Sequence, residues 1–207
     1  NLKQGRFMQK KFWDERYSEE RYVYGKEPNE FFKREIEHIT PGKILLPGEG
    51  EGRNAVYAAL KGWDVTAYDF SEQAKAKAMA LAKENNVKIN YVVSSVDEVL
   101  YKENEYDLAA LIFVHFPSAI REKTHKAIVK LLKRRGIILI EAFNKKQISN
   151  DTGGPKDFDS LYSIKDFEND FKGLKIEKLS ERHIELREGA YHKGPADVIR
   201  FRAVKMR

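Results

Sequence analysis

Three glycines at alternate positions constrain this chain more than any other feature. They are Gly48, Gly50 and Gly52, placed between a short apolar run and a helical pattern. Glycine at such a strand–helix turn lets a ligand approach the backbone, where any Cβ would clash. A second apolar run ends in Asp69, about 20 residues further on, where a carboxylate can accept hydrogen bonds from a ribose. The pattern predicts a βαβ unit that binds a nucleoside.

The spacing within the loop favours one class of nucleoside. A dinucleotide fingerprint reads G-x-G-x-x-G, but Arg53 stands here at the position of the last glycine. Two loop carboxylates, Glu49 and Glu51, would repel a pyrophosphate and favour a cation. S-adenosylmethionine (SAM) is a nucleoside that carries a sulfonium and an ammonium but no phosphate. The loop therefore favours SAM over NAD as the cofactor.

Composition limits the alternatives. The chain has 207 residues, of which 42% are hydrophobic, which is enough for one domain with a sizeable core. The absence of cysteine excludes disulfides and thiolate metal sites and fits a cytoplasmic location. No apolar run reaches the about 18 residues of a membrane span. The five histidines show no metal-ligand spacing, so neither a metal nor a membrane is expected as a partner.

The net charge of +6 does not mark a nucleic-acid surface, because acids and bases alternate along most of the chain. The densest basic clusters are residues 130–135, at the end of a predicted helix, and residues 200–207. Cations near a helix C-terminus are typical of a solvated surface. A nucleic-acid partner is therefore disfavoured, and no feature of the sequence marks a dimer face.

Hydrophobic periodicity predicts an alternation of strands and helices. Residues 1–42 are expected to form a helical lid, with helices over 8–20 and 28–39, and residues 43–207 the main domain of a single compact unit. The first five strands predicted along that domain are 43–47, 64–69, 88–94, 107–113 and 136–143. The predicted helices are 52–61, 71–85, 118–134 and 163–171.

The last two strand-like runs, 174–187 and 196–205, differ from the units before them. The connection between them is too short for a crossover helix, so the two strands must be antiparallel. We expect an α/β fold, a Rossmann-like three-layer sandwich with a seven-stranded, mostly parallel sheet and a C-terminal antiparallel hairpin. This ending is not the pattern of dinucleotide-dependent dehydrogenases.

Three segments together resemble one enzyme family. They are the N-terminal pattern Phe12-Trp-Asp-Glu-Arg-Tyr17 with residues 22–29, the loop 49–54, and Tyr191-His-Lys-Gly194. They are similar to class I SAM-dependent methyltransferases, and within that family to the tellurite-resistance and thiopurine-type group. The resemblance covers residues 10–207. It implies SAM as methyl donor, S-adenosylhomocysteine (SAH) as product and a small molecule as acceptor.

Two positions depart from the family pattern. Leu46 stands where the first strand usually carries an acid, so Glu49 would serve the methionine ammonium instead. Ser95 stands where an acid usually contacts the adenine amino group. Its hydroxyl would take that contact, helped by Asp97 or by the backbone N–H of Val96.

The resemblance and the loop together predict the cofactor contacts. Asp69 would accept hydrogen bonds from both ribose hydroxyls, or alternatively cap the 71–85 helix. Phe70 would flank the adenine or belong to the core, and Phe113 would line the methyl-donor end of the pocket. The full predicted set is Gly48, Glu49, Gly50, Gly52, Asn54, Asp69, Phe70, Ser95, Val96 and Phe113.

The aromatic N-terminal segment is expected to act as a lid that excludes water, as a staple on the sheet, or as both. The substrate and lid residues predicted are Trp13, Arg16, Tyr17, Tyr24 and, from the loop, Arg53. Arg16 would bind the cofactor carboxylate or an anionic substrate, or pair with Glu19 or Glu20. His115, after the fourth strand, is the candidate general base, against a structural role.

The predicted function is in-line transfer of a methyl group from SAM to a small, soft nucleophile. A thiol or a chalcogen oxyanion is suggested by the resemblance alone, and such an acceptor needs no dedicated base. The alternatives are an RNA or protein methyltransferase and a non-catalytic SAM-binding sensor. The fourth strand is not followed by the Asn-Pro-Pro-aromatic motif of amino-group DNA methylation, and no cysteine is present for methylation of cytosine C5.

Overall fold

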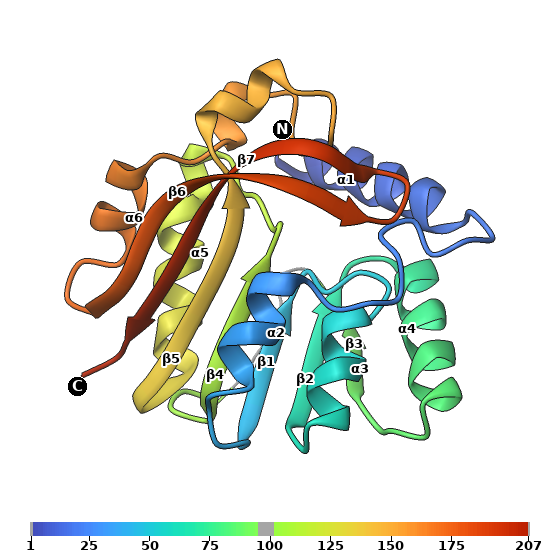
Figure 1. The fold of residues 1–207 in the computed structure, drawn as a ribbon, viewed down its shortest axis with the longest axis horizontal. Coiled ribbons are helices and arrows are strands. Elements are labelled where there is room, and N and C mark those ends of the chain that lie inside the picture. The colour runs from blue at the N-terminus through green and yellow to red at the C-terminus, as the bar shows by residue number, and fades with distance from the viewer. Residues whose placement is uncertain (1, 95–101, 207) are drawn as a thin grey trace.

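A computed structural model describes residues 2–94 and 102–206, which build one seven-stranded sheet covered by helices (Figure 1). The strand order is β3-β2-β1-β4-β5-β7-β6. The strands are β1 (Lys43–Pro47), β2 (Asp64–Asp69), β3 (Asn90–Val93), β4 (Tyr106–Ile112), β5 (Leu132–Phe143), β6 (Lys175–Glu188) and β7 (His192–Val204). The first five strands pair in parallel, and β7 runs antiparallel to both β5 and β6. The predicted fold class and its terminal hairpin are confirmed.

Helices cover both faces of this sheet. They are α1 (Leu2–Tyr17), α2 (Glu30–Ile36), α3 (Arg53–Leu60), α4 (Glu72–Glu84), α5 (Ser118–Leu131) and α6 (Ile164–Asp170), with short 3-10 turns η1 (Lys145–Ser149) and η2 (Phe158–Ser160). One apolar cluster holds α2, α3 and α4 against the sheet, and a second holds α5 and α6 against the opposite face. The result is the three-layer arrangement that the alternating pattern predicted.

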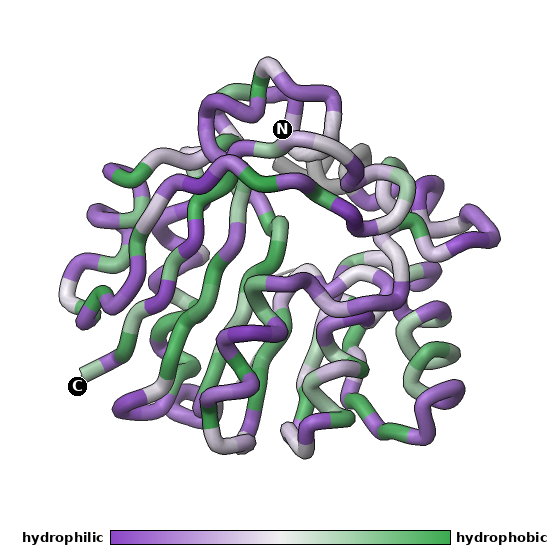
Figure 2. The backbone as a smooth tube through the Cα atoms, in the orientation of Figure 1, coloured by the Kyte–Doolittle hydropathy of each residue, from purple (hydrophilic) through white to green (hydrophobic). Residues whose placement is uncertain are grey.

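The central strands explain why the sheet is buried on both sides. In β1, Leu45 belongs to the α5–α6 cluster, whereas its neighbours Ile44 and Leu46 belong to the other cluster. Successive side chains of a strand point to opposite faces, so a continuous apolar run suits a strand with helices on both sides. Figure 2 shows hydrophobic residues along the central strands, whereas hydrophilic and hydrophobic residues alternate along the helices. Leu46, where the family usually has an acid, is fully buried.

The ends of β5 and β7 differ from the sequence prediction. Helix α5 ends at Leu131 and β5 begins at Leu132, not 136, with a register irregularity opposite Tyr106–Leu108. Strand β7 begins at His192, not 196, because its first residues pair with β6 before β5 joins at Val198. Pro195 is tolerated there because that part of the strand has a partner on one side only.

The N-terminal segment packs on the main domain through buried aromatic side chains. The two predicted helices exist with shifted ends, and Asn29 caps α2 by accepting the Phe32 N–H. Tyr17 and Val23 form a small cluster with Ala74 of α4. Whether residues 1–42 act as a separate lid stays a prediction. No helix in the described part of the chain is long and apolar enough to cross a membrane.

Candidate functional site

The three glycines lie between β1 and α3, at the carboxyl end of the parallel strands, and all adopt positive φ. A Cβ on Gly48 would lie 2.9 Å from a methyl group of Val114, and one on Gly50 would lie 2.7 Å from the Tyr17 hydroxyl. A Cβ on Gly52 would meet the Cβ of Ala78 at 2.6 Å, so this glycine lets α3 and α4 approach. The loop therefore requires glycine for both its backbone conformation and its close contacts.

Asp69, at the end of β2, faces this loop. Its Oδ2 accepts the Gly50 N–H at 3.2 Å and its Oδ1 accepts the Ser71 N–H at 3.1 Å. Helix α4 is capped by Ser71, which accepts the Ala74 N–H, so Asp69 is not the cap of that helix. Burial raises the pKa of Asp69 to about 6 despite these bonds. Each carboxylate oxygen retains acceptor capacity for a further donor.

The two loop carboxylates, Glu49 and Glu51, have different roles in the structure, although the sequence predicts the same role for both. Glu51 is buried, binds the Lys77 ammonium at 2.8 Å and accepts the Val23 N–H at 2.8 Å. It anchors the N-terminal segment, so the expectation that it favours a cationic ligand is wrong for Glu51. Glu49 is half-buried, and its Oε1 accepts the Ala55 N–H in the first turn of α3 at 2.7 Å. Burial raises the pKa of Glu49 to about 7.

Arg53 and Asn54 hold other segments onto the loop. The Arg53 guanidinium binds Glu188 at 2.7 Å and donates to the Tyr24 carbonyl at 3.3 Å. Asn54 accepts the backbone N–H of Asn29 at 3.0 Å. Both side chains are buried in these contacts, which favours an orienting role over direct ligand contact.

The predicted lid residues form one aromatic cluster beside the loop. Trp13 stacks on Tyr17 with ring centroids 5.4 Å apart, and Tyr24 lies 6.4 Å from Trp13 and 6.5 Å from Tyr17. A Cβ on Gly50 would lie only 2.7 Å from the Tyr17 hydroxyl, so this cluster packs directly against the glycine loop.

The tip of the β6–β7 hairpin closes on the same segment, and Figure 1 shows it reaching across to the N-terminal part of the chain. The Ala190 N–H donates to the Val23 carbonyl at 3.0 Å. The Tyr24 and His192 rings lie 4.4 Å apart. We call residues 13–25 and 188–192 together the cover, because they pack on the loop from opposite ends of the chain.

Phe113 and His115 follow β4, but they are held differently. Phe113 adopts a positive φ of 57° and stacks on Phe143 at 4.6 Å, with His192 edge-on at 4.7 Å. The His115 Nδ1–H donates to the Ser160 carbonyl at 2.8 Å, and Nε2 accepts the Phe143 N–H at 3.2 Å. Burial lowers the pKa of His115 to about 4. Both ring nitrogens are thus occupied, which favours a structural role.

His192 is a site residue that sequence reasoning missed. It is buried between Tyr24 and Phe113, and its Nδ1 lies 3.5 Å from a carboxylate oxygen of Glu188. The signal was present in the Tyr191-His-Lys-Gly194 segment, which carried the resemblance but received no role. Its partners lie far away in the chain, so spacing alone could not reveal them.

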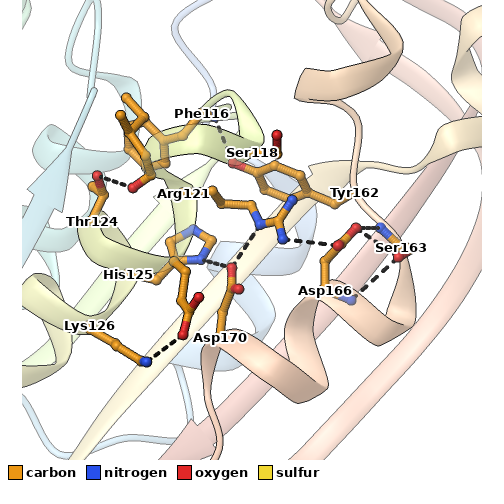
Figure 3. A network of polar contacts seen from close by, with 12 residues as sticks. Phe116, Ser118, Arg121, Thr124, His125, Lys126, Tyr162, Ser163, Asp166 and Asp170 are labelled. Carbon is orange, nitrogen blue, oxygen red and sulfur yellow. Dashed lines mark hydrogen bonds and ion pairs between the residues drawn. The ribbon is translucent and has the colours of Figure 1, made fainter.

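A polar network between α5 and α6 supports the turn that carries His115 (Figure 3). Arg121 binds Asp170 at 2.8 Å and Asp166 at 2.9 Å, and His125 Nδ1 donates to Asp170 at 2.8 Å. The Tyr162 hydroxyl accepts the Phe116 N–H at 2.7 Å. The network fixes the start of α5 and is built from buried or half-buried side chains.

The site therefore combines the loop, Asp69, the cover and the turn after β4. Phe70 is half-buried next to Asp69. Ser95 and Val96, predicted to contact the adenine, lie outside the described residues. In the described ranges, no group of three acidic or histidine side chains is arranged to hold a metal ion.

Comparison with known proteins identifies the central part of the chain. Residues 44–136, from β1 into β5, match the family described as "Methyltransferase domain". This part of the chain is similar to methyltransferase domains. The predicted resemblance to methyltransferases is confirmed by this match.

Two kinds of relatives match by sequence. A ubiquinone biosynthesis O-methyltransferase of Rickettsia bellii is 31% identical over 116 residues, which cover 56% of this chain and 48% of the relative. The probable SAM-dependent methyltransferase TehB of Haemophilus influenzae is 30% identical over 77 residues, which cover 37% of this chain and 27% of TehB. The chain thus spans half or less of the length of these relatives.

Solved structures extend the likeness of the fold to nearly the whole chain. The crystal structure of TehB from H. influenzae has a TM-score of 0.72 at 20% identity, with 95% of this chain and 67% of that chain covered. A structure from work on the conversion of a disulfide bond into a thioacetal group during echinomycin biosynthesis has a TM-score of 0.80 at 15% identity, covering 95% and 92% of the two chains. At such identities, the likeness shows the fold.

The residues of the methyltransferase domain fit SAM. Asp69 presents a buried carboxylate with unused acceptor capacity beside the glycine loop. Glu49, close by, offers the negative charge that Leu46 does not supply. The donor and acceptor types match a ribose and an ammonium.

Proposed function

We propose that this protein transfers the methyl group of SAM to a small, soft nucleophile such as a thiol or a chalcogen oxyanion. The observation that carries the proposal is the state of His115. Both of its ring nitrogens are hydrogen-bonded to the backbone. His115 follows β4, but it has no free lone pair with which to accept a proton from the methyl acceptor. An acceptor that is already nucleophilic near neutral pH needs no such base.

Each part of the site has a role in this proposal. Asp69 holds the ribose, and Glu49 holds the methionine ammonium with the oxygen that does not cap α3. The cover excludes water and aligns the acceptor with the methyl group. This alignment provides most of the catalysis. Alignment of two reactants can lower a barrier by about 7–11 kcal/mol.

The chemistry balances without a further reactant. The sulfonium supplies the activated methyl group. A lone pair of the acceptor forms the new bond to the methyl carbon, and the carbon–sulfonium bond breaks with its electron pair remaining on the sulfur of SAH. Any proton carried by a thiol acceptor passes to water or buffer.

A second candidate acceptor is a phenolic hydroxyl, which the similarity to the Rickettsia O-methyltransferases favours. A phenol needs more help in losing its proton than a thiol does. His192 beside Glu188 is the imidazole in the cover that could take this proton. This candidate therefore predicts that activity depends on His192.

An acceptor screen separates the two candidates. Purified protein is incubated with methyl-labelled SAM and a panel of thiols, selenite, tellurite and catechols, and SAH formation is followed. We expect turnover of thiols or oxyanions that persists in His115→Phe, which keeps an aromatic ring against Phe143. Turnover of catechols alone, lost in His192→Phe, would establish the second candidate. Failure of every acceptor despite SAM binding would support a sensor.

A further inference from the structure

Arg16 is an arginine of the cover whose surroundings differ from those of the other buried or half-buried arginines that the structure describes. It lies in the last turn of α1 and is half-buried. Its guanidinium carbon lies 4.3 Å from the centroid of the Tyr191 ring and 4.6 Å from that of Phe12. One of its nitrogens donates to the Tyr24 hydroxyl at 3.3 Å. Aromatic rings thus hold the planar cation in place.

No carboxylate within the described residues neutralises Arg16. The expected pairing with Glu19 or Glu20 is absent, because Glu19 bonds Arg21 at 2.8 Å and accepts the Tyr191 hydroxyl. Among the described arginines that are buried or half-buried, the others all bind carboxylates: Arg53, Arg121, Arg200 and Arg202. A guanidinium has five N–H donors, and the Tyr24 bond uses one of them.

Arg16 stands at one end of a row of side-chain contacts that leads to the end of β4. Tyr24, to which it donates, packs on His192 at 4.4 Å, and His192 packs on Phe113 at the end of β4 at 4.7 Å. Phe113 marks the predicted methyl-donor end. A continuous row of side chains therefore joins the unpaired cation to the place where the acceptor must react.

We propose that Arg16 binds an anionic group of the methyl acceptor, so that the substrates are small anions such as thiol-carboxylic acids or oxyanions. This inference rests on the proposed methyl transfer. The fork of an arginine matches a carboxylate or oxyanion through two parallel hydrogen bonds. Arg16 would then act as a specificity-determining residue that orients the acceptor, with its nucleophilic atom toward Phe113.

The test compares two acceptors that differ in charge alone. 3-Mercaptopropionate carries a carboxylate, and its amide has nearly the same shape without the charge. Calorimetry measures the dissociation constant of each for SAH-saturated protein, and SAM turnover gives kcat/KM. For Arg16→Gln, we expect the binding and kcat/KM of the carboxylate to fall roughly 10- to 100-fold more than those of the amide, because a charge-assisted pair is lost.

Two variants serve as controls. Arg21→Gln removes the same charge from the same segment, but Arg21 is exposed and already bound to Glu19, so the ratio between the two acceptors should stay close to that of the parent. Arg16→Lys keeps the charge without the fork and should retain part of the preference. Both comparisons separate anion binding from general damage to the cover.

Three outcomes would overturn the inference. One is an equal loss for both acceptors in Arg16→Gln. A second is failure of 3-mercaptopropionate to bind the SAH complex. A third is that Arg16→Gln binds SAH more weakly than the parent does but binds SAH without its carboxylate equally well. That result would assign Arg16 to the carboxylate of the cofactor. Failure of SAM and SAH to bind the parent protein would instead contradict the proposed methyl transfer itself.

Discussion

Asp69 and Glu49 are two carboxylates that backbone N–H groups orient beside the glycine loop. Each is held by a backbone N–H of the loop or of the helix after it, and each has an oxygen with unused acceptor capacity. Burial raises both pKa values, to about 6 for Asp69 and about 7 for Glu49. A ligand that donates hydrogen bonds or carries a positive charge would favour their ionised forms.

Asp69→Asn tests the ribose contact. The amide keeps the shape of the side chain but replaces one acceptor oxygen with a donor, so a ribose hydroxyl loses its partner. We expect SAM binding to weaken about tenfold or more, corresponding to roughly 1.5–3 kcal/mol for a bond to a charged group. Calorimetric titration with SAM measures this. Asp64→Asn, at the exposed start of the same strand, is the control, and an equal effect there would refute the assignment.

Glu49 gives a pH dependence with a defined sign. Its folded pKa of about 7 lies above the ordinary value of 4.5, so the folded state binds more protons than the unfolded state between these values. The contribution of Glu49 to the free energy of unfolding should therefore fall as pH rises from about 4.5 to 7, whereas the lowered pKa of His115 acts in the opposite direction. An ammonium partner requires the ionised form, so SAM affinity should rise over the upper part of this interval. Denaturant titrations and calorimetry at several pH values measure the two effects.

Glu49→Gln provides the comparison for that prediction. The variant should show a smaller decline of stability with rising pH and weaker SAM binding at pH 8. Asp69, Glu141 and His115 contribute to the slope of parent and variant alike, so the difference between the two slopes isolates Glu49. If the free energy of unfolding had the same pH dependence in parent and variant, Glu49 would not be the group that takes up a proton on folding.

At the scale of elements, the cover depends on a close approach between the hairpin tip and the N-terminal segment. A Cβ on Gly189 would lie 2.4 Å from the Val23 carbonyl oxygen and 2.6 Å from the Gly25 nitrogen. Gly189→Ala should therefore separate the two segments, speed hydrogen exchange of residues 17–25 and raise the off-rate of SAM, while the sheet persists.

Gly173→Ala is the matched control for that variant. Gly173 also has a positive φ, of 98°, but a Cβ there would meet no atom within 4 Å. It should show the cost of backbone strain alone, about 1 kcal/mol, without faster exchange in the cover. Equal exchange rates in the two variants would mean that contact at Gly189 does not hold the cover closed.

The network between α5 and α6 is expected to support the fold without binding a ligand. Asp170→Asn leaves the Arg121 charge with Asp166 alone and weakens the bond to His125, so the free energy of unfolding should fall by roughly 3–5 kcal/mol. Chemical denaturation measures this loss. Glu122→Gln breaks an exposed pair with Lys126 on the same helix and should change stability by less than about 0.5 kcal/mol. Similar losses in both variants would contradict this account.

At the scale of the whole molecule, the centre of the sheet could be predicted from the sequence because β1 and β4 are short apolar runs with local breakers. The antiparallel hairpin followed from the length of one connection. The start of β7 could not be predicted, since it depends on Pro195 having a partner strand on one side only. Strand ends depend on pairing, which a linear pattern does not record.

The site was predictable where local sequence determines geometry and not where distant segments meet. The glycine loop and the position of Asp69 follow from spacing within one βαβ unit. The roles of Glu51 and His192 depend on Lys77, Val23 and Tyr24, which the fold brings together from separate segments. His115 lies at the predicted turn, but its backbone bonds to Ser160 and Phe143 were invisible in the sequence.

Calorimetric titration of the purified protein with SAM tests whether the molecule binds this cofactor. We predict one SAM per chain, displacement of SAM by SAH at the same site, and no heat from NAD. NAD carries the pyrophosphate that the glycine loop, with Glu49 beside it, should repel. Absence of binding by both SAM and SAH, or binding of NAD in their place, would contradict the account.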